Sequence, residues 1–247
     1  SDSMSPGDIA ELSQSSSLAF RIIGDIQALP PRTELYWRAM ALDEYDGSKW
    51  TSHFFNQNVI QLNPADLKPK RTLNYQYLAA DSSVMWIMSL EQSVPNEARY
   101  SLGQDGRITP YRLTARTEPI QLKWLGSAEP PQIKNVALLE KLNTRYVEHL
   151  DVKSQQLAQT LWQRSHQNPE RYIAEVLQWY KQNLFAYTLS PGVLGQNRID
   201  DFLFGSRQGF CEHFASSFAM LMRYVGVPSR IVVGYQGGQL APDGKSW

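Results

Sequence analysis

The chain has 247 residues, of which 42% are hydrophobic and 19% charged, a balance typical of a folded globular protein and unlike that of a disordered one. Lysine plus arginine and aspartate plus glutamate both number 24, so the formal net charge is zero and no basic surface is expected for a nucleic-acid partner. No apolar run reaches the roughly 18 residues of a membrane-spanning helix.

The single cysteine and the few histidines limit metal and redox chemistry. One thiol, Cys211, can form neither an internal disulfide nor a multi-thiolate metal site, so it is either a buried structural thiol or a reactive one. None of the histidines has a spacing typical of a metal site. They are His53, His149, His166 and His213. The adjacent Asp200 and Asp201 lack further oxygen ligands, so no metal and no cofactor are expected.

The first half of the chain predicts β-structure. Aromatic and β-branched residues fall into short runs typical of strands, at residues 18–23, 35–42, 72–78 and 120–125. Turn-forming pairs separate these runs. One of them, Asp46-Gly47, predicts a hairpin anchored by a buried Trp50, although a recognition loop is the alternative.

The pattern changes near residues 126–131, where two adjacent prolines interrupt helices and sheets alike. The residues beyond these prolines have helical rather than alternating periodicity. We therefore predict two domains, a β-rich N-terminal domain over residues 1–128 and a second domain over residues 129–247.

Three helices are predicted in the second domain. The first covers residues 155–165. The second begins at Asn168, a capping residue followed by a first-turn proline, and runs to Asn183. The third begins near Cys211, preceded by glycines that loosen the approach, and stops at Gly226, since glycine accepts the left-handed conformation that ends helices.

The spacing along the third helix predicts a thiol at its first turn, on an inward-facing stripe. The residues of that stripe are Cys211, Ala215, Phe218 and Met222. A helix N-terminus carries about half a positive charge, which favours thiolate over thiol. We therefore expect a depressed pKa at Cys211 and a base reaching it from a neighbouring strand.

The neighbours of Cys211 are interpreted as structural. His213 lies two positions along the helix, a rotation of about 200°, so it is expected to be a hydrogen-bonded structural residue and not the base. Glu212 is expected to act as a first-turn partner of the helix dipole. Trp179 and Tyr187 could line a groove for the acyl donor, although aromatic residues on a helical stripe are more often part of the core.

The chain continues with a predicted buried strand over residues 229–235 and a glycine-rich loop over residues 236–247. A helix-borne cysteine followed by two strands is an arrangement in which the second strand delivers an imidazole to the sulfur. That second strand would follow the loop.

Four sequence blocks resemble the core of bacterial transglutaminase-like proteins, most closely those of the TgpA type. They are Asp201-Phe-Leu-Phe, Gly209-Phe-Cys-Glu-His-Phe-Ala, Arg223-Tyr-Val-Gly-Val-Pro-Ser-Arg and Val233-Gly-Tyr-Gln-Gly-Gly. The likeness extends upstream to residues 185–191 and into the first domain at residues 35–38 and 45–50. It therefore covers nearly the whole chain.

The resemblance implies an α+β fold, in which a β-rich N-terminal domain precedes a papain-like (transglutaminase-like) core truncated at its C-terminal strands. It also implies a periplasmic domain of an inner-membrane protein, held by flanking membrane segments outside this chain. The implied activity is that of a protein-glutamine gamma-glutamyltransferase. Its partners would be a glutamine-containing protein or peptide as acyl donor and a primary amine as acceptor.

In that family a cysteine, a histidine and an aspartate act together. Cys211 matches the nucleophile and its backbone N–H would donate to the oxyanion, whereas the family histidine and aspartate lie beyond the glycine-rich loop and have no match here. The chain as given is therefore expected to be inactive. Two alternatives remain open from the sequence: a papain-like peptidase or amidase, and a non-catalytic interaction domain.

Overall fold

The computed structural model describes residues 3–4, 15, 17–61, 68–69, 71–81, 86–112, 118–126 and 136–247. The chain forms two compact units whose segments interleave along the sequence. The helical unit comprises residues 1–15, 42–52 and 135–231, and the β unit comprises residues 16–41, 53–134 and 232–247.

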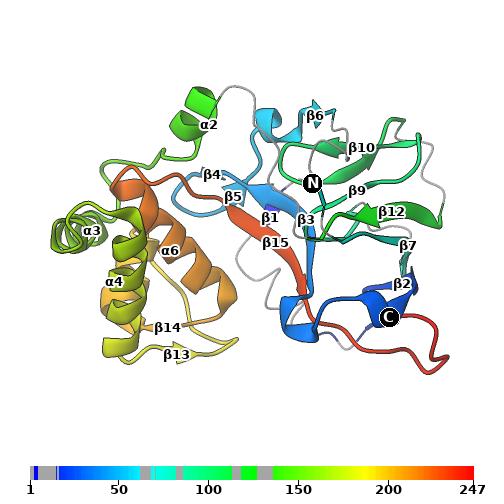
Figure 1. Cartoon of the computed structure of the whole chain (residues 1–247). Helices are drawn as coiled ribbons and strands as arrows, with labels where there is room; N and C mark the ends of the chain where they lie inside the picture. Colours follow the sequence, from blue (N-terminus) through cyan, green and yellow to red (C-terminus); the bar gives the residue numbers. More distant parts are fainter. Residues whose placement is uncertain are drawn as a thin grey trace. The chain divides into compact units, whose positions relative to one another are not determined.

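A four-stranded antiparallel sheet dominates the β unit (Figure 1). In sheet order its strands are β2 (Phe20–Gly24), β7 (Leu73–Ala79), β12 (Ile120–Trp124) and β9 (Ser93–Pro95). Three of them confirm the strands predicted at residues 18–23, 72–78 and 120–125. Alternation explains β7, since Leu73, Tyr75 and Tyr77 are buried while the residues between them are less so.

A second sheet is built around the strand predicted at residues 35–42. Here β3 (Tyr36–Leu42) lies between β15 (Ile231–Gln236) and β8 (Ser89–Leu90). Gly234 allows the close approach of β15 to β3, because a Cβ there would overlap the carbonyl of Trp37. The strand predicted over residues 229–235 is confirmed from Ile231 onward, but the prediction that it is buried is wrong, because every residue of β15 is half-buried or exposed.

The remaining structure of the β unit is short. A third sheet has the order β11, β10, β6, with bounds Ile108–Pro110, Tyr100–Gly103 and Val59–Ile60. Short 3-10 helices are η1 (Ile26–Ala28), η2 (Arg32–Glu34) and η3 (Phe54–Gln57). These elements are only two to four residues long. Such short elements agree with the many turn signals in the first half of the sequence.

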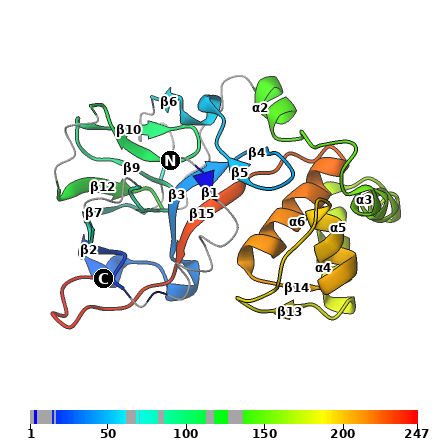
Figure 2. The same ribbon diagram turned by 180° about the vertical axis from the view of Figure 1, so that it is seen from behind.

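Helices form most of the helical unit (Figures 1 and 2). They are α2 (Val136–Leu142), α3 (Val152–Arg164), α4 (Pro169–Gln182), α5 (Arg198–Asp200), the π-helix η5 (Asp201–Ser206) and α6 (Cys211–Tyr224). All three predicted helices are confirmed. The predicted cap of α4 is present, since Asn168 Oδ1 accepts from the Arg171 N–H at 3.0 Å.

Helices α3 and α4 pack against one side of α6 (Figure 2). The Tyr172 hydroxyl, on α4, donates to the Leu221 carbonyl at 2.6 Å, and Tyr180 shares a hydrogen bond of 2.5 Å with Ser217. Trp162 on α3 meets the Tyr172 ring edge-on, with centroids 5.2 Å apart. Buried aromatic groups whose polar ends are hydrogen-bonded therefore fix the position of α6.

The predicted hairpin is also confirmed, as β4 (Glu44–Tyr45) and β5 (Trp50–Thr51), with β1 (Ser3–Met4) paired to β5. Its turn follows Asp46-Gly47: Asp46 Oδ1 accepts from the N–H groups of Ser48 and Lys49, each at 2.8 Å, and Gly47 has a φ of +97°. Trp50 is 3% exposed, so it anchors the hairpin as predicted.

Arg223, which is only 1% exposed, joins this hairpin to the C-terminal end of α6. Its guanidinium donates at 2.7–3.2 Å to the backbone carbonyls of Asp43, Arg145 and Ser229. It also lies 5.1 Å from the centre of the Trp50 ring. Burial lowers the pKa of Arg223 to about 10, so the side chain remains charged at neutral pH.

The predicted boundary between residues 128 and 129 lies outside the described residues and stays a prediction. The two units do not divide at one point of the chain. Residues 42–52 pack with the helical unit, and residues 232–247 with the β unit. In the part of the chain that the structure describes, no helix has the length and apolarity needed to cross a bilayer.

Candidate active site

Cys211 is the first residue of α6, which confirms the predicted helix start. A short parallel ladder leads into it, formed by β13 (Ala186–Tyr187) and β14 (Gln208–Gly209). The Thr188 N–H donates to the Gly209 carbonyl at 2.8 Å. Since Phe210 is extended, the chain turns abruptly from this ladder into the helix. The ladder therefore fixes the position of the first residue of α6, which carries the thiol.

His213 closes the first turn of α6. Its Nδ1 accepts from the Phe210 N–H at 3.3 Å, while its own backbone N–H donates to the Phe210 carbonyl at 2.9 Å. Burial, with a smaller contribution from Arg198, lowers the pKa of His213, so the ring is neutral at neutral pH. The expectation that His213 is hydrogen-bonded is confirmed.

Gly209 is required for this cap. A Cβ added there would lie 2.6 Å from Cβ and Cγ of His213 and 2.9 Å from Cε1 of Phe202. Gly205, by contrast, has nothing within 4 Å of such an atom. Gly205 and Gly209 were both expected to give the chain before the helix conformational freedom. Only Gly209 has a steric role, and it is needed there because the packing around it leaves no room for a side chain.

The prediction that Cys211 lies on an inward-facing stripe is wrong. Cys211 and Ala215 are exposed, Phe218 is half-buried, and only Met222 of the four stripe residues is buried. The buried face of α6 lies on the other side, where the tyrosines of α4 bind its residues. An apolar stripe at helical spacing does not say which neighbour covers it, and here Cys211 lies at an exposed position of the first turn.

The expected depression of the thiol pKa is also wrong. Partial burial of the sulfur raises the pKa of Cys211, even though the residue as a whole is exposed. The Glu212 backbone N–H and the Tyr187 hydroxyl act in the opposite direction, and the Glu212 carboxylate raises the pKa further. At neutral pH the group is therefore a thiol. The helix start alone does not make it a nucleophile.

Of the two aromatic residues predicted as groove candidates, the structure places only Tyr187 beside Cys211. Its hydroxyl lies close enough to the sulfur to lower the pKa of the Cys211 thiol, and the residue is 63% exposed. Trp179 is half-buried and packs among the rings of Tyr180, Phe185 and Phe204, with centroids 5.7–5.9 Å apart. Whether either contacts an acyl donor stays a prediction.

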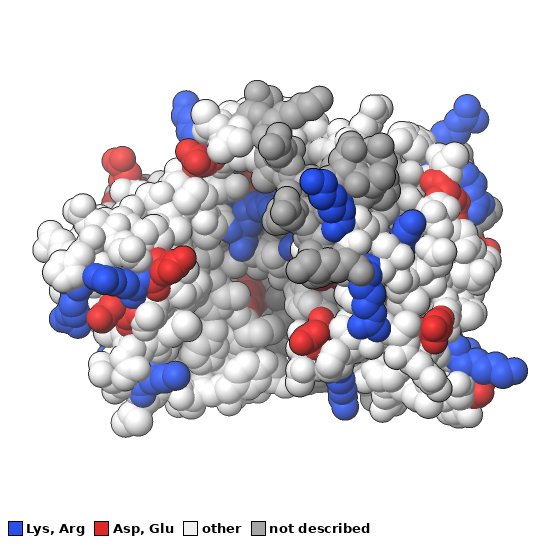
Figure 3. Space-filling view, viewed as in Figure 1, with Lys and Arg blue, Asp and Glu red and all other residues white. Residues whose placement is uncertain are grey.

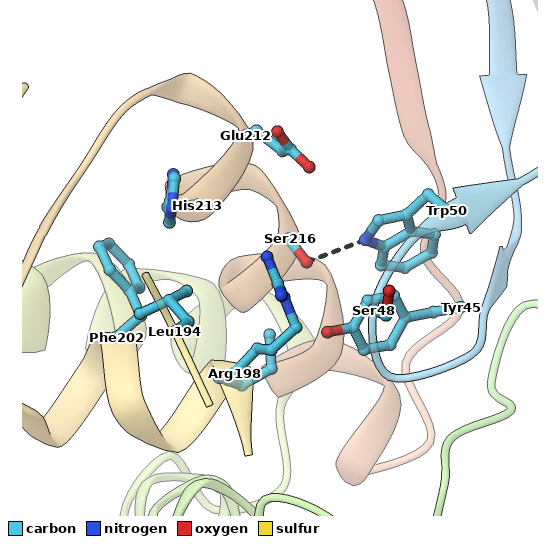
Figure 4. Close-up of a pocket in the computed structure, with 10 residues that line it drawn as sticks. Tyr45, Ser48, Trp50, Leu194, Arg198, Phe202, Glu212, His213 and Ser216 are labelled. Atoms are coloured by element: carbon cyan, nitrogen blue, oxygen red, sulfur yellow. Dashed lines mark hydrogen bonds between the residues drawn. The ribbon is translucent and has the colours of Figure 1, made fainter. Parts of the chain in front are cut away.

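A pocket lies beside the first turn of α6, within the helical unit (Figure 4). Its empty volume is about 350 Å³, which includes solvent at its mouth. Its lining residues are Tyr45, Ser48, Trp50, Leu194, Arg198, Ile199, Phe202, Glu212, His213 and Ser216. The Trp50 indole N–H donates to Ser216 Oγ at 2.8 Å across one wall, so the hairpin is fixed to the helix there. The predicted structural hairpin therefore also contributes to a cavity, which no sequence pattern indicated.

The two adjacent aspartates bind backbone groups. Asp200 Oδ1 accepts from the Ser154 N–H at 2.8 Å at the start of α3, and the Asp200 N–H donates to Asp151 Oδ1 at 3.0 Å. Asp201 Oδ2 accepts from the Gly195 N–H at 2.7 Å. Burial, followed by smaller effects that include the Asp200 charge, raises the pKa of Asp151 to about 6. Among the described residues no group of three or more histidine, cysteine or acidic side chains could hold a metal ion.

Basic and acidic side chains are interspersed on the surface of the helical unit, on the left of Figure 3. Arg198 lines the pocket, and the sequence did not single it out because a lone arginine carries no motif.

Comparisons with known proteins agree over nearly the whole chain. The family described as "TgpA N-terminal domain" matches residues 1–133, and the "Transglutaminase-like superfamily" matches residues 155–247. A curated relative, "Protein-glutamine gamma-glutamyltransferase" of Pseudomonas aeruginosa PAO1, is 34% identical over 251 residues, covering 99% of this chain. The chain spans only 36% of that relative's length. "Uncharacterized protein YebA" of Bacillus subtilis 168 is 30% identical over 84 residues, covering 33% of this chain and 11% of that protein.

Two solved structures share the fold. The crystal structure of the periplasmic domain of TgpA from Pseudomonas aeruginosa matches with a TM-score of 0.83 at 32% identity, covering all of this chain and 84% of that one. The same domain bound to ethylmercury matches with a TM-score of 0.82 at 31% identity, covering 100% of this chain and 86% of that one. The predicted α+β fold, with a β-rich N-terminal region and a transglutaminase-like core, is thereby confirmed. The chain belongs to the transglutaminase-like superfamily and, within it, to the TgpA type.

Proposed function

We propose that this chain is the cysteine-bearing part of a periplasmic protein-glutamine gamma-glutamyltransferase, with Cys211 as its nucleophile. The observation that carries the proposal is an exposed thiol at the first residue of a rigidly packed helix. A relative with that name and a solved periplasmic domain of the same type support it. Flanking membrane segments outside this chain would hold the protein at the inner membrane.

In the proposed reaction the Cys211 thiolate attacks the γ-carboxamide carbon of a glutamine side chain. The C–N bond breaks, ammonia leaves with the proton taken from the thiol, and the acyl group remains on sulfur as a thioester. A primary amine or water then attacks the thioester and releases the sulfur. The acyl donor is a glutamine-containing protein or peptide, and the acceptor is an amine.

The first turn of α6 supplies electrostatic help for this step. The first N–H groups of a helix lack intrahelical partners, so the Cys211 N–H can donate to the oxyanion of the tetrahedral intermediate. The Glu212 backbone N–H and the Tyr187 hydroxyl lower the pKa of the Cys211 thiol and so stabilise its anionic form. In other enzymes the loss of one such donor slows the reaction by about 10²–10³-fold.

A base is still needed, because the thiol of Cys211 is protonated at neutral pH. We propose that an imidazole oriented by an aspartate, as the family resemblance implies, comes from a part of the protein that follows this chain. The chain by itself is then inactive. The alternative is a non-catalytic domain that keeps the transglutaminase-like fold.

The two candidates are separated by assaying the full-length protein. Incorporation of a labelled primary amine into a glutamine-containing protein is measured together with ammonia release and peptide cleavage. Ammonia release that the Cys211→Ala variant abolishes, with amine incorporation in parallel, is the expected result. Peptide cleavage without amine incorporation would show that the protein is a peptidase and not a transferase. A protein with none of these activities would support the non-catalytic domain.

A further inference from the structure

We propose that the pocket beside the first turn of α6 binds a carboxylate group of the substrate, through Arg198 and His213. This inference deepens the proposed function, because it names a chemical feature of the substrate bound next to Cys211. Both groups line the same pocket, and neither belongs to the nucleophile's own contacts (Figure 4). Their hydrogen-bonding states carry the argument.

Arg198 is a cation without an internal partner. It is half-buried on α5, and within the residues that the structure describes its guanidinium makes no ion pair and no hydrogen bond. Its guanidinium points toward the first turn of α6 in Figure 4. A partly desolvated guanidinium presents a planar fork of donors that matches a carboxylate in shape and charge. The pocket therefore favours an anionic group at this place.

His213 provides a second donor on the same wall. Because its Nδ1 accepts from the Phe210 N–H, the proton of the neutral ring is on Nε2. The described residues offer no hydrogen-bond acceptor to that Nε2–H. Its pKa is lowered by burial and, to a smaller extent, by the charge of Arg198, so the two groups influence one another across the pocket. A ligand carboxylate can thus accept one hydrogen bond from the Arg198 guanidinium and one from the His213 Nε2–H.

Two other polar side chains that line the pocket, those of Tyr45 and Ser216, are already hydrogen-bonded. The Tyr45 hydroxyl donates to the Gly47 carbonyl at 3.0 Å, and Ser216 Oγ accepts from the Trp50 indole at 2.8 Å. The rings of these residues make that wall largely apolar. An apolar wall excludes water and strengthens the interaction of a bound carboxylate with Arg198.

Glu212 makes the two sides of the pocket differ in charge. Its carboxylate points toward Trp50, away from His213, in Figure 4. A ligand carboxylate is repelled from that side and is therefore held at the Arg198 side, whereas an amino group on the same ligand is favoured near Glu212. The carboxylate can belong to the amine acceptor, if that acceptor is an amino acid, or to a blocked peptide end of the acyl donor.

The test uses binding and needs no activity. A ¹⁵N-labelled Cys211→Ala protein is titrated with N-acetylglycine, glycine and glycinamide, and the resonances of the Trp50 indole and of residues 212–216 are followed. Both carboxylates are expected to shift these resonances, and glycinamide is not. Tighter binding of glycine than of N-acetylglycine identifies an amine acceptor, and the reverse order identifies the acyl donor.

Two arginine variants complete the test. Arg198→Gln is expected to weaken carboxylate binding at least about 10-fold, the scale of one charge-assisted hydrogen bond. Arg164→Gln, at an exposed position of α3, is the matched control and should bind as the parent does. Equal shifts with glycinamide, or unchanged binding in a folded Arg198→Gln protein, would overturn the inference. Since Cys211 is absent from the protein, failure of the proposed function leaves this outcome unaffected.

Discussion

The two ends of α6 differ in how the structure uses them. The C-terminal end is buried and fixed: Arg223 binds three backbone carbonyls, and Gly226, with a φ of +83°, ends the helix. The N-terminal end carries an exposed thiol and is fixed by a histidine cap, a two-residue ladder and the hydrogen bond from Trp50 to Ser216. The Cys211 thiol can therefore be exposed to solvent without loss of order, because the buried C-terminal end of α6 fixes the orientation of the helix.

The largest expected effect lies at the buried end. Arg223→Met removes a buried cation and leaves the carbonyls of Asp43, Arg145 and Ser229 without their donor. We expect the free energy of unfolding to fall by about 3–5 kcal/mol, since breaking a buried charged network is strongly destabilising. Urea unfolding followed by circular dichroism measures it.

Arg171→Met is the control for Arg223→Met, because Arg171 is an exposed arginine of α4 whose side chain makes no such network. It should change stability by less than about 0.5 kcal/mol. Equal losses in the two variants would show that Arg223 does not hold the buried end of the helix.

The next effect tests the packing of the open end. Gly209→Ala places a Cβ against His213 and Phe202, so we expect a loss of about 1–3 kcal/mol from overpacking. Gly205→Ala, with open space around it, should be close to neutral. Thermal unfolding of both variants checks this pair, and a similar loss at Gly205 would contradict the steric explanation.

A smaller effect concerns the acid dependence of the helical unit. The pKa of Asp151 is about 6 in the folded protein and 3.8 in an unperturbed aspartate, so the folded carboxyl binds more protons between these pH values. The stabilising contribution of this group is therefore present below about pH 4 and lost as the pH rises through 6, which amounts to about 1–2 kcal/mol after solvent screening.

Asp151→Asn keeps the oxygen that accepts from the Asp200 N–H but cannot titrate. It is expected to remove the decline in unfolding free energy that Asp151 causes between pH 4 and 6, as measured by urea unfolding at several pH values. An unchanged decline in the variant would assign the pH dependence to other groups.

The smallest expected effect is on thiol reactivity. Tyr187→Phe removes a hydrogen bond that favours the thiolate, so the pKa of Cys211 should rise and alkylation by iodoacetamide at pH 8 should slow about 3-fold. Glu212→Gln removes a charge that disfavours the thiolate, so it should accelerate alkylation by a similar factor. Rates measured across pH 7–10 check both signs, and two variants changing in the same direction would exclude this electrostatic explanation.

Much of the fold follows from local patterns. A run of aromatic and β-branched residues predicted β7, a capping Asn168 predicted the start of α4, and Asp46-Gly47 predicted a hairpin, because each depends on interactions within a few residues. The start of α6 at Cys211 and its end at Gly226 were predictable for the same reason. The sequence by itself thus determined where the thiol lies along its helix.

Only the tertiary structure decided the environment of that thiol. Which face of α6 is buried depends on Tyr172 and Tyr180, more than thirty residues earlier in the chain, so the apolar stripe gave the wrong direction for Cys211. The pKa of Cys211 depends on desolvation and on the approach of Tyr187, neither of which a helix-dipole argument contains. The pocket brings the hairpin near residue 45 together with α5 and α6. Burial and long-range pairing are properties of the packed chain, and no short segment encodes them.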